Sequence, residues 1–195
     1  MITKPLNSFI LGILTVSIIL LVNQFFRDTL VFHRSGIDSG QWWLLISGNF
    51  VHSNYPHLFL NLAGLWIFGF LFFDNVSLKT FIISTILLSV SVGIGLYIFD
   101  PELQKYYGFS GILYGLFLIG ATSSPLSKDW FTGISIILFI VGKIIWDLVY
   151  GGSSSSAALI GMPVAVHAHL YGALGAFLIS VGLYLIHLKN YLKAS

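Results

Sequence analysis

Long apolar segments, separated by short polar connections, make up most of the chain. Six of them approach the roughly 20 apolar residues that a helix needs to cross a bilayer. They lie at about 6–26, 57–73, 78–99, 109–124, 130–150 and 163–187, and the fourth is the shortest. The pattern predicts an all-α membrane protein in which residues 1–195 form a single transmembrane domain, a six-helix bundle.

Two connections between the segments are long enough to carry features of their own. Residues 27–56 contain Trp42 and Trp43, which suit the aromatic belt at a membrane surface. Residues 151–162 begin GGSSSSAA, and the glycines and serines predict a mobile loop. The first apolar segment is too long for a signal peptide, and no small-residue cleavage site follows it, so we expect a retained transmembrane helix.

The composition strengthens the membrane assignment. Of the 195 residues, 56% are hydrophobic and 8% are charged, whereas a soluble domain carries about 25% charged residues. The chain has no cysteine, which excludes disulfides and thiolate chemistry. Its net charge is +2 and its basic residues are scattered, so nothing indicates a nucleic-acid partner.

The lysines and arginines suggest an orientation in the membrane. An even number of spans places both termini on one side, and more basic residues fall on that side than on the other. The side of the termini would hold Lys4, Lys79, Lys128, Lys189 and Lys193, and the opposite side Arg27, Arg34 and Lys105. This bias predicts cytoplasmic termini.

Polar residues gather where the second, fourth and sixth segments begin. These three segments run in the same direction, so the clusters are expected at one depth, on the outer side of the membrane. The clusters are His52, His57 and Asn61; Gly108, Ser110 and Gly111; and His167 and His169.

Small residues predict that the fourth and sixth helices touch near these clusters. Pairs of small residues four positions apart let helix backbones approach closely in membranes. The pairs are Gly111 with Gly115 and Gly172 with Ala176. Such a contact would bring Ser110 within hydrogen-bond reach of His169.

This arrangement predicts nucleophilic catalysis. The Ser110 hydroxyl becomes a nucleophile when a base takes its proton, and His169 can be that base and later protonate a leaving amine. His57, Asn61 and the backbone N–H of Ser110 are candidate donors to an oxyanion. No acidic residue is obviously placed to orient His169, so we expect a Ser-His dyad, with Tyr114 holding the imidazole by ring packing.

Three motifs resemble those of the rhomboid family of intramembrane serine proteases. The family's GxSG is similar to Gly108-Phe109-Ser110-Gly111, and its tyrosine four residues after the serine to Tyr114. Its H-x4-H-x3-N is similar to His52, His57 and Asn61, and its A-H-x-x-G to the stretch from Ala168 to Gly172. One departure is Leu44 after Trp43, where many rhomboids have arginine.

The resemblance implies roles for these residues and no cofactor. Ser110 would be the nucleophile, His169 the base, His57 and Asn61 the oxyanion donors, and His52 a loop-ordering residue. The stretches GQWWLLISGNFVHSNYPHLFLNLAGLW and YYGFSGILYGL further resemble the rhombosortase branch. That branch implies a bacterial inner membrane, a periplasmic active site, and membrane protein substrates with a C-terminal Gly-Gly motif, apolar helix and basic end.

Other functions fit the sequence less well. A metal site at the histidines is disfavoured because H-x4-H is not a zincin spacing and the two histidines of His-Ala-His point apart on a helix. A catalytically inactive relative that binds transmembrane helices would typically lack the serine or the histidine. A channel would need polar residues across the whole membrane. We expect Lys143 and Asp147 to form an ion pair facing the bundle.

Overall fold

The computed structural model of the chain describes residues 6–123 and 130–194, with the side chains of residues 6, 7, 187, 190, 193 and 194 left out. Lys4, Lys128 and the Lys193 side chain, three of the lysines that suggested the orientation, therefore lie outside the described residues. In the first half of the chain the helices are α1 (Leu6–Asn23), η1 (Gln24–Phe26), α2 (Arg27–Leu30), α3 (Arg34–Asp38), α4 (Leu44–Ser47), η2 (Gly48–Phe50), α5 (Tyr55–Phe72) and α6 (Leu78–Phe99). Those that follow are α7 (Ser110–Ser123), α8 (Trp130–Tyr150), α9 (Ser154–Ile160) and α10 (Val166–Ala194), and two short strands are β1 (Phe32–His33) and β2 (Lys105–Tyr106).

Within the described residues, five helices are long and apolar enough to cross a membrane. They are Ser8–Leu30, Tyr55–Phe72, Leu78–Phe99, Trp130–Tyr150 and Val166–Ile186. The fourth predicted span corresponds to α7, which has 14 residues and is therefore about 21 Å long. A bilayer core is about 30 Å thick, so α7 does not meet the length of a full span, and the expected count of six is not reached by this criterion.

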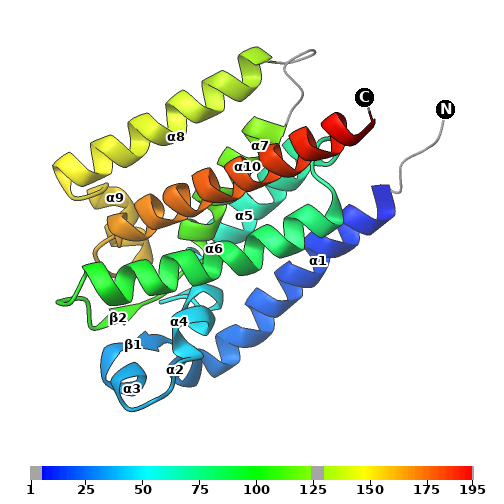
Figure 1. Cartoon of the computed structure of the whole chain (residues 1–195). Coiled ribbons are helices and arrows are strands. Elements are labelled where there is room, and N and C mark those ends of the chain that lie inside the picture. The colour runs from blue at the N-terminus through cyan, green and yellow to red at the C-terminus, as the bar shows by residue number, and fades with distance from the viewer. Residues whose placement is uncertain (1–5, 124–129, 195) are drawn as a thin grey trace.

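Helices α5, α7 and α10 run in the same direction. Contacts between α7 and α10 follow the same order along both helices, from Ser110 with His169 to Thr122 with Ser180. The three predicted clusters therefore lie at one end of the bundle, as expected. Helix α1 begins and α10 ends at the other end (Figure 1).

Helix α7 lies at the centre of the bundle, and α8 lies at its edge. Successive turns of α7 bury Ile112, Leu116 and Ile119. In α8, by contrast, Phe139 is 70% exposed and Leu138 67% exposed. Large apolar side chains in such numbers on the outside of a helix fit a lipid environment and not water.

The connection between α1 and α5 folds into short elements beside the cluster end of the bundle. Strands β1 and β2 pair antiparallel, with Phe32 opposite Tyr106. The Arg34 guanidinium donates to four backbone carbonyls at and just beyond the end of α6, which are those of Leu96, Tyr97, Asp100 and Leu103. These bonds satisfy acceptors that a helix C-terminus leaves unpaired. The pairing of β2 with β1 then connects the strand that leads into α7 to the segment that carries Arg34.

The expectation of a loop at residues 151–162 is wrong, because this stretch contains α9. The Ser153 hydroxyl caps the helix by accepting from the Ser156 amide, and Gly161 ends it with φ of +72°. Serine favours both loops and helix N-caps, so composition alone does not separate the two outcomes. Hydrogen bonds from Ser53 to the Ile160 carbonyl and from Asn54 to the Leu159 carbonyl hold α9 against the start of α5.

Two asparagines have structural roles in the segments that lead into α5. Asn54 caps α5 by accepting from the His57 amide. Asn49 is fully buried in η2, where its amide lies within hydrogen-bond distance of the carbonyls of Leu45, Ile46 and Ser89.

Candidate active site

Helices α7 and α10 meet backbone against backbone. A Cβ added to Gly172 would lie 1.9 Å from the Gly111 carbonyl oxygen, and one added to Gly111 would lie 2.8 Å from the Ala168 carbonyl oxygen. One turn further, a Cβ on Gly115 would lie 2.8 Å from the Gly172 carbonyl oxygen. The small residues identified in the sequence therefore form the contact between the two helices, and we call Gly111, Gly115 and Gly172 the glycine seam.

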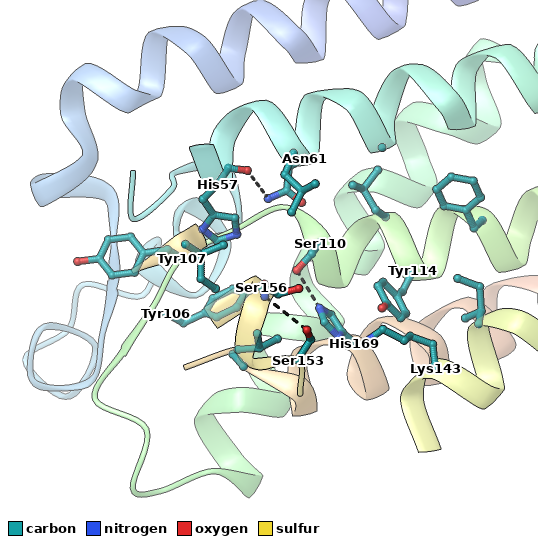
Figure 2. A pocket seen from close by; sticks show the side chains of 18 of the residues that line it. His57, Asn61, Tyr106, Tyr107, Ser110, Tyr114, Lys143, Ser153, Ser156 and His169 are labelled. Carbon is teal, nitrogen blue, oxygen red and sulfur yellow. Dashed lines mark hydrogen bonds between the residues drawn. The ribbon is translucent and has the colours of Figure 1, made fainter. Parts of the chain in front are cut away.

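The glycine seam brings Ser110 and His169 together at the first turns of their helices. The Ser110 Oγ and the His169 Nε2 lie 3.0 Å apart. His169 is 6% exposed, and the Tyr114 ring stacks on its imidazole with centroids 4.1 Å apart and planes 2° apart (Figure 2). Packing of this kind fixes the plane of the imidazole, so the ring can turn little about its link to α10.

Gly108 gives the chain a conformation that only glycine adopts easily. Its φ is +122°, and an added Cβ would lie 2.8 Å from the His57 ring. The buried Tyr106 hydroxyl donates to the Gly108 carbonyl at 2.7 Å, and burial raises the pKa of Tyr106 above its usual range, so the phenol stays a donor. These contacts hold the turn that presents Ser110 at the start of α7.

His57 and Asn61 line the same cavity as Ser110, from successive turns of α5. One amide hydrogen of Asn61 is used, because Nδ2 donates to the His57 carbonyl at 3.1 Å. The Ser53 hydroxyl has one hydrogen and gives it to the Ile160 carbonyl, so its oxygen accepts from Nδ1 of His57 at 3.1 Å. In this arrangement a neutral His57 carries its proton on Nδ1 and none on Nε2.

His52 lies behind His57, fully buried in the segment that leads into α5. Its backbone exchanges two hydrogen bonds of 3.0 Å with the Gln24 amide, and its ring meets the His57 ring edge-on at 5.0 Å. This fits the loop-ordering role that the resemblance implied. Gln24 carried no sequence signal, because a single glutamine after an apolar helix is common.

Burial, followed by the nearby His57, lowers the pKa of His52 to about 3. An unfolded histidine binds a proton near pH 6.5, so below that pH the unfolded state holds a proton that the folded state does not. Stability should therefore fall as the pH drops from about 6.5 towards 3, by up to about 1.4 kcal/mol per pH unit. We expect His52→Phe to reduce this fall, measured as melting temperature against pH in detergent. Equal pH dependence in both proteins would contradict the assignment.

A carboxylate that the sequence did not connect with the site lies beside His169. The predicted pair of Lys143 with Asp147 is present, and Asp147 is fully buried. However, the Asp147 Oδ2 also lies 3.7 Å from the His169 Nδ1. The expectation that no acidic residue is placed near His169 is therefore wrong. Helix α8 runs antiparallel to α10, which brings the end of α8 next to the start of α10.

The second histidine of α10 belongs to a different cluster. His167 contacts the Asp100 carboxylate, which also accepts from the Tyr171 hydroxyl at 2.8 Å. This ties the start of α10 to the end of α6 and directs His167 away from Ser110. Across residues 6–123 and 130–194, no group of three or more His, Cys, Asp or Glu side chains is arranged to hold a metal ion.

A cavity of about 430 Å³ opens next to Ser110 and His169. Its polar residues gather at one end, where Figure 2 shows His57, Asn61, Ser110 and His169 converging. Its walls are otherwise mostly apolar and come from α5, α7, α8 and the segment from α9 to α10. The wall residues of α5 and α8 are Leu60, Gly64, Ile67, Ile136, Phe139 and Ile140. The cavity therefore combines a polar end, at Ser110 and His169, with room for an apolar chain.

Comparisons with known proteins identify the family of the chain. The family model of the rhomboid domain matches residues 39–186. A Bacillus subtilis (strain 168) protein named "Putative rhomboid protease YdcA" is 24% identical over 154 residues, 79% of this chain and 73% of that protein. "Rhomboid-like protein 11, chloroplastic" of Arabidopsis thaliana is 28% identical over 141 residues, which are 68% of this chain and 49% of that protein. The match therefore spans about half the length of the Arabidopsis protein. Since the domain model covers most of its length, the chain belongs to the rhomboid family of integral membrane proteins.

Proposed function

We propose that the protein is an intramembrane serine endopeptidase with Ser110 as nucleophile and His169 as general base. The observation that carries the proposal is the 3.0 Å contact between the Ser110 Oγ and the His169 Nε2, at the polar end of a cavity between apolar helices. A serine and a histidine in this contact are the parts that acyl transfer needs. Membership of the rhomboid family supports the same reaction.

In the reaction, the Ser110 oxygen attacks the carbonyl carbon of the scissile peptide while its proton passes to the His169 Nε2. The imidazolium then protonates the leaving amine, and the acyl-enzyme remains. A water molecule attacks the acyl-enzyme in the second half, with His169 again taking and returning the proton. Stacking on Tyr114 keeps the Nε2 directed at both the serine and the leaving group.

The negative charge that develops on the carbonyl oxygen needs donors. The Ser110 amide stands at the first residue of α7, where helix N–H groups have no acceptor within the helix. Asn61 has a second amide hydrogen beyond the one given to the His57 carbonyl. His57 donates from Nε2 when its ring is protonated, or when the Ser53 hydroxyl turns from Ile160 to Nδ1.

The walls of the cavity favour a transmembrane segment as substrate. Apolar residues of α5 and α8 face an entering chain, while only an unwound stretch places a peptide bond at Ser110. Glycines break a helix readily, so a tail with a Gly-Gly motif followed by an apolar helix fits this route. We therefore propose cleavage of C-terminal anchoring tails of the rhombosortase type, with cytoplasmic termini and the site facing the periplasm of a bacterial inner membrane.

The proposal is tested by labelling the purified full chain with a fluorescent serine-reactive phosphonate. We expect the wild type to be labelled and Ser110→Ala to remain unlabelled. Ser123→Ala, at the other end of α7, is the matched control and should label like the wild type. Absence of labelling in the wild type would contradict the proposal and favour a rhomboid-like protein that binds transmembrane helices without cutting them.

A further inference from the structure

Two buried polar atoms face each other behind the Ser110–His169 pair. The His169 Nδ1 and the Asp147 Oδ2 are 3.7 Å apart, and the two side chains are 7% and 1% exposed. Among the described residues, neither atom has a hydrogen-bond partner. Buried polar atoms are almost always paired, so two unpaired atoms this close to one another indicate a shared role.

The chemistry of the two atoms is complementary. The Ser110 hydroxyl can give its proton only to an unprotonated Nε2, so a neutral His169 that acts as base carries its own proton on Nδ1. That Nδ1–H is a donor, and it lies opposite a carboxylate oxygen, which is an acceptor. A closing movement of less than about 1 Å gives an ordinary hydrogen bond.

Neighbouring residues hold both partners in this relation. Lys143, one turn before Asp147 on α8, pairs with the other carboxylate oxygen, Oδ1, and so leaves Oδ2 directed at α10. The stacked Tyr114 ring fixes the plane of the imidazole. The two ring nitrogens of His169 therefore face different partners: Nε2 faces Ser110 and Nδ1 faces Asp147.

We propose that Asp147 is a positioning residue for His169, an inference that rests on the proposed function. Its carboxylate selects the tautomer with Nδ1–H and stabilises the imidazolium that forms when Ser110 gives up its proton. The proton moves from the Ser110 Oγ to the His169 Nε2 and then to the leaving amine, while the Nδ1 proton stays on the ring and Asp147 remains ionised. The site then works as a serine, a histidine and an aspartate from α7, α10 and α8.

The low dielectric of a membrane interior makes this contact consequential. A carboxylate within 4 Å of a developing positive charge interacts with it far more strongly there than in water. Lys143 competes for the same carboxylate, so it limits how strongly Asp147 can stabilise the imidazolium. Among the described residues, the titratable groups around His169 are Asp147 and Lys143 on α8, Tyr114 on α7 and His57 on α5.

The test is the rate of phosphonate labelling of Ser110 in the full-length protein between pH 5 and 9. Asp147→Asn keeps the shape of the side chain and removes its charge. We expect a maximum rate roughly 10- to 100-fold lower than in the wild type, because the tautomer is no longer selected and the imidazolium is no longer stabilised. We also expect the acidic limb of the profile to move to lower pH, since the neutral, reactive ring persists further into acid.

Two further variants test whether the effect is specific to the Asp147 carboxylate. Asp100→Asn makes the same chemical change beside His167, the other histidine of α10, and should leave rate and profile within about twofold of the wild type. Lys143→Met removes the competitor for the Asp147 carboxylate and should move the acidic limb to higher pH. If Asp147→Asn does not fold, the pH profile of Lys143→Met tests the positioning role of Asp147 instead.

Three outcomes would overturn the inference. The first is an Asp147→Asn rate within about twofold of the wild type, and the second is a lower rate with an unshifted profile, which indicates a structural role only. The third, should Asp147→Asn not fold, is an unshifted Lys143→Met profile. If the wild type is not labelled, the result differs from these three outcomes, because it overturns the proposed function itself and this inference with it.

Discussion

Without the His169 imidazole, cleavage of a tailed membrane substrate is expected to fall by at least about a thousandfold. His169→Ala removes the group that we propose as the base for the Ser110 proton and as the acid for the leaving amine. His169→Phe removes the same functions but keeps a ring for Tyr114 to stack on. Both variants should lose activity to the same extent, which we would measure as the initial rate of product formation in proteoliposomes.

The matched control is His167→Phe, two residues earlier on α10. Its side chain contacts Asp100 and not Ser110, so this variant should retain cleavage close to the wild-type rate. Residual cleavage above one per cent or so in His169→Phe, with intact folding, would contradict the role of His169 as base. Equal losses in the His167 and His169 variants would point to a general disturbance of the start of α10.

The second large effect is expected from one methyl group in the glycine seam. In Gly172→Ala the new Cβ would lie 1.9 Å from the Gly111 carbonyl oxygen, whereas such atoms normally stay about 3.3 Å apart or more. Both partners are backbone, so no side chain can turn away and α7 and α10 must separate. We expect a loss of stability of about 3 kcal/mol or more and a Ser110–His169 gap too wide for proton transfer.

Thermal unfolding in detergent and phosphonate labelling would measure the two parts of this prediction. Gly182→Ala is the control, because it adds the same methyl group to the same helix where nothing lies within 4 Å. It should keep or slightly raise the melting temperature, since alanine favours helices. A Gly172→Ala protein that melts and labels like Gly182→Ala would show that the two helices do not rely on this contact.

The main features of the site could be predicted because they follow from helix geometry. Length and hydropathy locate the long helices. The shared direction of alternate spans then places His57, Ser110 and His169 at one end before any contact is known. The glycines of the seam are also readable, since close helix contacts in membranes need small residues at a spacing of four.

What could not be predicted depends on side-chain contacts between different elements. Asp147 and Lys143 look like a self-contained pair in the sequence, and only the antiparallel packing of α8 beside α10 turns one carboxylate oxygen towards His169. The Ser53 hydroxyl that sets the His57 tautomer depends in the same way on α9, which the serine-rich composition did not reveal.

Because α7 is short, we expect the thickness of the surrounding bilayer to affect the proposed reaction. Helix α7 is about 21 Å long, about 9 Å less than a hydrocarbon layer of about 30 Å, whereas α6 and α10 are long enough to span such a layer. A bilayer of shorter acyl chains brings the headgroups and their water nearer to Ser110, and one of longer chains moves them away. We therefore expect the proposed hydrolysis to depend on the lipids of the host membrane, although no lipid needs to touch the reacting atoms.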